Sequence, residues 1–221
     1  MQILFSLPFL KNNPYLLTSV MQFIAFFLTV TCLYIYDLFQ DYEEIKRVFK
    51  DRLYPGKQTI WQDLKLGALS WFIATPVVFT LSQISEMVTS IFFGKPQTQQ
   101  IAVESLKQST TSPISFITVL ISILLFAPFL EEYLFRGVLQ SWLRRKIGAV
   151  QSIFFTAGAF ALLHFSPQQD WTNIPLITSL FAFGCYLGFV YEKSRSLFTP
   201  IVLHVTFNFV SVMRIILIEA N

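Results

Sequence analysis

The chain has 221 residues, of which 54% are hydrophobic and only 13% are charged, and its formal net charge is +3 at pH 7. This composition, with 25 phenylalanines, is typical of a membrane protein and excludes an ordinary soluble domain. The lipid bilayer is therefore its expected partner. The chain carries no nucleic-acid signature.

Uncharged apolar stretches recur along the chain at lengths that suit helices crossing a bilayer, which need roughly 17 to 25 residues. Lipid leaves unpaired backbone groups without water, and no segment alternates like the strands of a barrel. We therefore predict an all-α polytopic transmembrane bundle. About six spans are expected, in the apolar stretches 15–36, 66–93 (interrupted only by Glu86), 114–130, 147–165, 174–191 and 197–213.

Residues 1–112 are predicted to hold two of these spans, the connection between them, and a polar linker over 94–112. The connection has one apolar helical face, which indicates an interfacial amphipathic helix, formed by Leu38, Tyr42, Ile45, Phe49 and Leu53. Residues 113–221 hold the other four spans and most of the ionisable groups within spans. We expect this second part to be the functional core.

Lysines and arginines are divided unequally between the two sides of this arrangement. Most of them, including Arg144, Arg145 and Lys146, fall in connections on one side. Cationic side chains prefer the cytoplasmic ends of spans. We therefore expect an integral multi-pass protein whose basic loops face the cytoplasm.

Glu131, Glu132 and Arg136 stand at the end of the uncharged stretch 114–130. An ionisable side chain at membrane depth costs about 2.5 to 3.5 kcal/mol on insertion scales, so these three need a reason to be there. Residues four apart share a helical face, so Glu132 and Arg136 are expected to form a structural ion pair while Glu131 points elsewhere. Pro128 removes a backbone hydrogen bond and should bend the helix.

The two histidines of the chain both lie in apolar segments of the same region, His164 near the end of the predicted fourth span and His204 in the sixth. Measured along helices from the shared turn at 144–148, Glu131 and His164 reach similar depths, so the two side chains can meet. Asn208 follows His204 by four residues and lies on the same helical face. These polar groups are the candidate site.

Three motifs thus occur in order on separate spans: Glu131-Glu132-x-x-x-Arg136, Phe160-x-x-x-His164 and His204-x-x-x-Asn208. The ordered set resembles the intramembrane endopeptidases related to CAAX prenyl proteases and bacteriocin-processing enzymes, the CPBP or Abi-type family. The resemblance covers roughly residues 114–213. It implies hydrolysis of a peptide bond in a membrane-associated protein or peptide substrate.

Peptide hydrolysis in a membrane demands an activated water, a base and stabilisation of an oxyanion. The resemblance implies Glu131 as the base, His164 as the group that positions the water, and His204 and Asn208 as donors to the oxyanion. Glu132 and Arg136 would hold the helix. This mechanism uses no metal or other cofactor.

Other interpretations of the same residues stay open. Glu131, His164 and His204 are candidate Zn²⁺ ligands, so a bound divalent metal is an alternative. A bis-histidine haem protein would use the two imidazoles as axial ligands. A non-catalytic membrane scaffold or immunity protein of the same fold is a further alternative. No residue pattern specifies the substrate or the oligomeric state.

Overall fold

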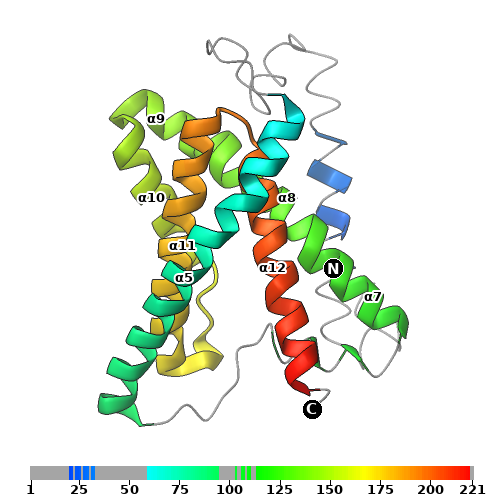
Figure 1. Cartoon of the computed structure of the whole chain (residues 1–221), viewed down its shortest axis with the longest axis vertical. Helices are drawn as coiled ribbons and strands as arrows, with labels where there is room; N and C mark the ends of the chain where they lie inside the picture. The colour runs from blue at the N-terminus through cyan, green and yellow to red at the C-terminus, as the bar shows by residue number, and fades with distance from the viewer. Residues whose placement is uncertain are drawn as a thin grey trace.

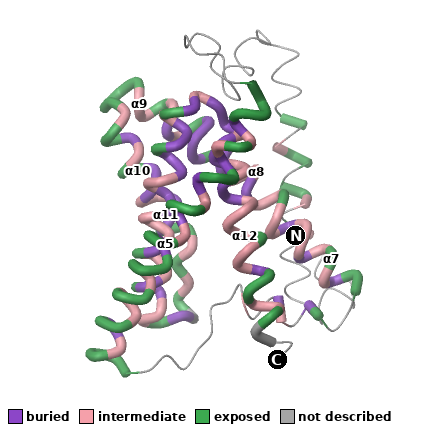
Figure 2. The backbone as a smooth tube through the Cα atoms, viewed as in Figure 1, coloured by how far each residue is buried: buried purple, intermediate pink, exposed green. Residues whose placement is uncertain are grey.

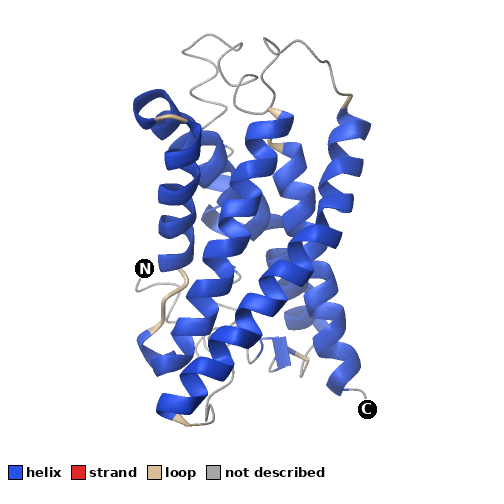
Figure 3. Cartoon of the chain, turned by 60° about the vertical axis from the view of Figure 1, so that its left-hand side comes forward, coloured by secondary structure: helices blue, strands red, loops and turns tan. Residues whose placement is uncertain are grey.

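The computed structural model describes residues 20, 21, 23–25, 27–29, 31, 32, 59–94, 103, 106, 107, 109, 110 and 113–219. This part of the chain is almost entirely helical and contains no strand, so the predicted all-α fold is confirmed (Figure 3). Much of the predicted first span, the predicted interfacial helix and most of the linker lie outside the described residues. The residues described between 20 and 32 are helical.

Four helices in the described part of the chain are long and apolar enough to cross a membrane: Ile60–Phe93, Pro113–Ile147, Gln169–Ser194 and Phe198–Leu217. They correspond to four of the predicted spans, but the count of six is not confirmed. The stretch expected to form a span at 147–165 instead forms the 14-residue helix α10 (Ala149–Leu162). At 1.5 Å per residue this helix is about 21 Å long, short of the roughly 30 Å hydrocarbon core.

The first of these helices, α5 (Ile60–Phe93), begins with a capping box. The backbone N–H of Thr59 donates to Oε1 of Gln62 at 2.7 Å, and the backbone N–H of Gln62 donates to Oγ1 of Thr59 at 3.4 Å. It packs against both α11 (Asn173–Ser194) and α12 (Phe198–Glu219), as Figure 1 shows. A Cβ on Gly67 would lie 2.5 Å from the carbonyl oxygen of Thr199, so only glycine permits this approach to α12.

The helix Pro113–Ile147 is built from five segments, two of which are π-helical. They are α7 (Pro113–Ile121), the π-helix η1 (Ser122–Phe126), α8 (Ala127–Glu132), the π-helix η2 (Tyr133–Gln140) and α9 (Ser141–Ile147). In Figure 1, α7 runs obliquely toward α8, and α9 lies at the opposite side of the bundle. π-Helical turns inside α-helices are frequently found at functional sites.

The core lies where η2, α10, α11 and α12 meet, and it is joined by Ala74 and Val78 of α5. Figure 2 shows buried residues gathered around this meeting point, whereas the far end of α5 is largely exposed. α5 is therefore part of the same core as the segments after residue 113. The large apolar residues exposed on outward faces suit contact with lipid; Phe72, Ile91 and Phe92 are examples.

Candidate active site

The short helix α8 places two adjacent carboxylates in different surroundings. The side chain of Glu132 is completely buried, whereas that of Glu131 is 27% exposed. Neighbouring residues diverge by about 100° around a helix axis, so the two carboxylates cannot share one environment. Glu132 is therefore enclosed and Glu131 is accessible, as expected from their positions on the helix.

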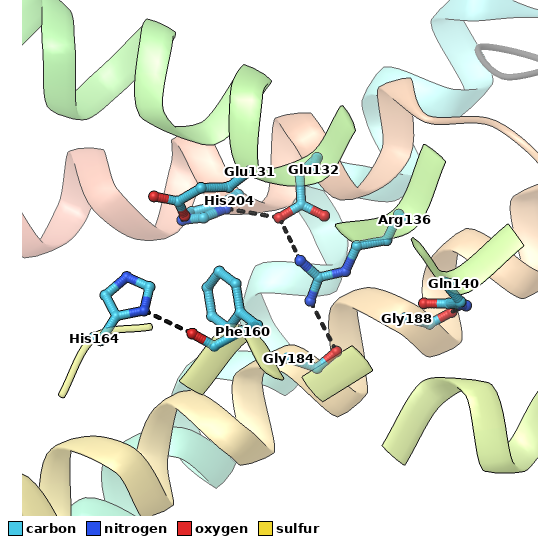
Figure 4. A network of polar contacts seen from close by, with 9 residues as sticks. All are labelled: Glu131, Glu132, Arg136, Gln140, Phe160, His164, Gly184, Gly188 and His204. Carbon is cyan, nitrogen blue, oxygen red and sulfur yellow. Dashed lines mark hydrogen bonds and ion pairs between the residues drawn. The ribbon is translucent and has the colours of Figure 1, made fainter. Parts of the chain in front are cut away.

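Glu132 is held from two sides through the same oxygen (Figure 4). Nη1 of Arg136 donates to Oε1 of Glu132 at 3.0 Å, which is the ion pair expected from the spacing of four residues. Nδ1 of His204 donates to the same Oε1 at 2.8 Å. Glu132 therefore joins two spans as well as holding its own helix.

Arg136 connects these polar contacts to α11. Its side chain is fully buried, and Nη2 donates to the backbone carbonyl of Gly184 at 3.0 Å. The guanidinium also lies over the ring of Phe160, 4.9 Å from the ring centroid. Such a cation–π contact is strongest when water is excluded. The guanidinium thus connects α8 and η2 with α10 and α11.

Glu131 lies beside the other nitrogen of the same imidazole. Its Oε2 is 3.8 Å from Nε2 of His204, longer than a direct hydrogen bond. Since Nδ1 of His204 donates to Glu132, the neutral ring presents a lone pair at Nε2 and only the doubly protonated ring donates there. A group such as water that bonds both Glu131 and Nε2 is compatible with this spacing.

His164 occupies a turn just beyond α10 and is positioned by its own helix. Its Nδ1 lies 2.8 Å from the carbonyl oxygen of Phe160, and its ring centroid is 4.9 Å from that of Phe160. Because a carbonyl only accepts, Nδ1 carries a proton, and in the neutral ring Nε2 is then an acceptor. No direct hydrogen bond joins His164 to Glu131; both lie to the same side of Phe160 in Figure 4.

Phe160 and Phe183 define the apolar side of the site. The ring of Phe160 packs edge-on against His204 with a centroid distance of 6.0 Å, and that of Phe183 does so at 5.3 Å. Both phenylalanines are buried. Phe160 therefore contacts both imidazoles and Arg136.

Asn208 makes a contact that the sequence did not suggest. Its Nδ2 donates to the backbone carbonyl of Ile123 in η1 at 3.0 Å. An amide nitrogen carries two N–H groups, so this bond occupies one of them. The contact joins α12 to the helical segment immediately before α8.

Three further residues that support the network were missed at the sequence level. Nε2 of Gln140 donates to the carbonyl of Gly188 at 3.1 Å, one turn above the bond from Arg136 to Gly184. A Cβ on Gly188 would lie 2.8 Å from Oε1 of Gln140. The spacing of two glycines four residues apart in an apolar span, which permits close helix packing, was the available signal.

Asn173, the fourth missed residue, holds the turn and the short 3₁₀ helix (η3, Pro167–Thr172) that follow His164. Its Oδ1 accepts from the backbone N–H of Ser166 at 2.9 Å, and its Nδ2 donates to the carbonyls of Ser166 at 2.7 Å and Asp170 at 2.9 Å. Asn173 is itself buried. Its side chain supplies the partners that this irregular backbone cannot find in a helix.

The metal alternative requires at least three ligating side chains close together. The described residues contain no group of three or more His, Cys, Asp or Glu side chains arranged to hold a metal ion.

One of three comparisons with known proteins returned a match. Residues 113–210, a little under half of the chain, match the family model described as type II CAAX prenyl endopeptidase Rce1-like. The comparisons with curated proteins and with solved structures gave no significant match. The matched segment contains all three motifs and extends from α7 into α12. The match agrees with the resemblance inferred from these motifs: residues 113–210 of this membrane protein are similar to the Rce1-like, CAAX-protease type of the CPBP family.

Proposed function

We propose that this protein is an intramembrane endopeptidase in which Glu131 activates a water molecule. The observation that carries the proposal is the contrast between the two adjacent carboxylates. Glu132 is enclosed by Arg136 and His204, whereas Glu131 is partly accessible beside the remaining nitrogen of His204. A base must reach water, and Glu131 meets that requirement.

The reaction would proceed by direct attack of water on the scissile carbonyl carbon. Glu131 accepts a proton from the water as the new carbon–oxygen bond forms and the carbonyl oxygen becomes an oxyanion. Collapse of this intermediate breaks the carbon–nitrogen bond, and Glu131 returns the proton to the leaving amine. The products are one new carboxylate and one new amine, with no oxidation or reduction.

His164 and His204 have separate roles in this scheme. Nε2 of His164 accepts a hydrogen bond from the water, since Nδ1 is engaged by the carbonyl of Phe160. His204 donates from Nε2 to the oxyanion, which requires the doubly protonated ring because Nδ1 already donates to Glu132. Asn208 contributes the N–H that Ile123 does not occupy.

The substrate class follows from where the site lies. α10 ends before it could cross a bilayer, and His164 lies in the irregular segment beyond it. Irregular backbone at membrane depth is tolerated where protein or a water-filled cavity surrounds it. We infer that water reaches the site here and that the substrate is a membrane-associated protein or peptide.

Cleavage by wild-type protein in proteoliposomes tests the proposal. The probes are an internally quenched farnesylated peptide with a CAAX terminus, the same peptide without the farnesyl group, and membrane extracts analysed for new peptide ends. In water enriched in ¹⁸O, each new carboxylate should gain ¹⁸O. Absence of cleavage of every probe by folded protein would favour the non-catalytic alternative.

His164→Ala and Leu163→Ala form a matched pair for this assay. Leu163 neighbours His164 in the chain but is 76% exposed, so its substitution should leave cleavage within about twofold of wild type. His164→Ala should reduce cleavage by at least about a hundredfold. Loss of cleavage on chelation, restored by a divalent ion, would instead support the metal alternative.

Two further proposals concern arrangement. The basic loops are proposed to face the cytoplasm. A cysteine introduced at Lys146 should then be protected from a membrane-impermeant thiol reagent in intact cells, and labelling of this cysteine would contradict the proposal. The chain is proposed to divide functionally at residue 112, with the site in residues 113–221. Dependence of cleavage on a polar group before residue 112 would contradict that division.

A further inference from the structure

The carbonyl of Ile123 has lost both of its helical donors. In an α-helix it would accept from the N–H of residue 127, but that N–H donates to the carbonyl of Ser122 in the π-helical turn. In the π-helical register the next donor would be residue 128. This residue is Pro128, which has no N–H.

Asn208 supplies the missing donor from another span. Its Nδ2 lies 3.0 Å from the carbonyl oxygen of Ile123, although the two residues are 85 apart in the chain. A backbone carbonyl inside a membrane needs a partner, because neither lipid nor a dry core can provide one. The side chain of Asn208 therefore replaces a backbone group that the proline removed.

The break lies directly before the residues on which the proposed reaction depends. Pro128 is buried at the start of α8, and Glu131 and Glu132 follow within the next turn. Asn208 is on α12, one turn after His204, which holds Glu132. One face of α12 thus contacts this helix on both sides of Pro128, at Ile123 and at Glu132.

We propose that Asn208 is a positioning residue that closes the backbone break at Pro128 and so fixes α8 and Glu131 relative to His204. This inference rests on the proposed function only for its effect on turnover. The second N–H of the amide leaves room for a direct contact with the oxyanion. The positioning role exists without any substrate.

A four-protein cycle tests this role: wild type, Asn208→Leu, Pro128→Ala and the double variant. Restoring an N–H at position 128 gives the carbonyls of the break a backbone donor, so Asn208 should become dispensable for order in α8. Asn208→Leu should raise backbone hydrogen exchange in residues 124–133 by about tenfold or more and lower the unfolding temperature. In the Pro128→Ala background, both effects of Asn208→Leu should be less than a third of their size in the wild-type background.

Turnover of the farnesylated peptide provides the functional arm. Asn208→Leu should lower kcat by about tenfold or more while KM stays within about twofold, because a displaced base impairs chemistry more than binding. The kcat of the double variant should be at least about threefold higher than that of Asn208→Leu alone. Thr206→Val is the control, since the Thr206 hydroxyl donates to Val202 of its own helix at 2.8 Å. Its effects should be the same in both backgrounds.

Equal exchange, stability and kcat losses in the two backgrounds would overturn the proposal. If Asn208→Leu does not fold, we expect the double variant to recover folded protein. Equal loss of folded protein in the single and the double variant would overturn the proposal. Hydrogen exchange and stability need no substrate. An inactive wild type would therefore refute the proposed function without deciding the role of Asn208.

Discussion

Replacing Arg136 by methionine should strongly destabilise the fold. Arg136 donates to Glu132 and to the carbonyl of Gly184, both at 3.0 Å, and its side chain is fully buried. Methionine retains much of the side-chain length but leaves both acceptors without this donor.

The expected loss can be worked from these contacts. Removing one partner of a buried ion pair costs about 3 to 5 kcal/mol, because the other charge remains buried. His204 still donates to Glu132 in the variant, so we expect the lower end, about 3 kcal/mol. For a chain of this length, that corresponds to a fall of about 6 to 12 °C in the unfolding temperature.

Two variants control for the loss of charge itself. Arg145→Met removes an exposed arginine from the same continuous helix and should change stability by no more than about 0.5 kcal/mol. Glu132→Gln combined with Arg136→Met removes both charges and should be more stable than Arg136→Met alone by at least about 1 kcal/mol.

Unfolding of purified protein by SDS in mixed micelles, followed by tryptophan fluorescence, measures these free energies. The reasoning would be refuted if Arg136→Met lay within 1 kcal/mol of wild type. It would equally be refuted if the double variant were less stable than the single one, since the pair would then not be the source of the loss.

Three other predictions concern packing, the segment after His164, and turnover. Gly67→Ala should lower the unfolding temperature, because the new Cβ meets the carbonyl of Thr199 at 2.5 Å. Gly158→Ala should raise it slightly, because nothing lies within 4 Å of that Cβ. The reverse order of the two variants in a thermal-shift assay would contradict this packing. Asn173→Leu should cost about 1 to 3 kcal/mol and speed hydrogen exchange after His164 by removing three hydrogen bonds, and unchanged exchange there would argue against its role. His204→Ala should lower kcat by about a hundredfold or more with little change in KM, and an effect on KM alone would remove the oxyanion role.

The apolar stretches predicted the helical fold well because membrane depth imposes one length on a span. The helix in the stretch 147–165 is shorter than predicted, since hydropathy does not report where a helix ends. α10 stops at Leu162, and Pro167 begins the 3₁₀ turn (η3, Pro167–Thr172). The Pro at 167 was the available sign that the apolar stretch and the helix do not coincide.

Within the site, spacing of four residues correctly paired Glu132 with Arg136, because the two lie on one helix with fixed geometry. The bond of His204 to Glu132 rather than to Glu131 could not be predicted in this way, since it depends on how two separate helices rotate and approach. The contact of Asn208 with Ile123 depends in addition on a π-helical turn. Sequence spacing assumes a regular α-helix and does not reveal such a turn.

The most direct test of the proposed chemistry is the cleavage rate of Glu131→Gln relative to wild type, measured on the farnesylated peptide at equal amounts of folded protein. Glu131 is partly exposed and its Oε2 lies 3.8 Å from His204, so the substitution should leave the unfolding free energy within about 1 kcal/mol. We expect cleavage to fall by at least about a thousandfold. A rate within tenfold of wild type would contradict the role of Glu131 as the base.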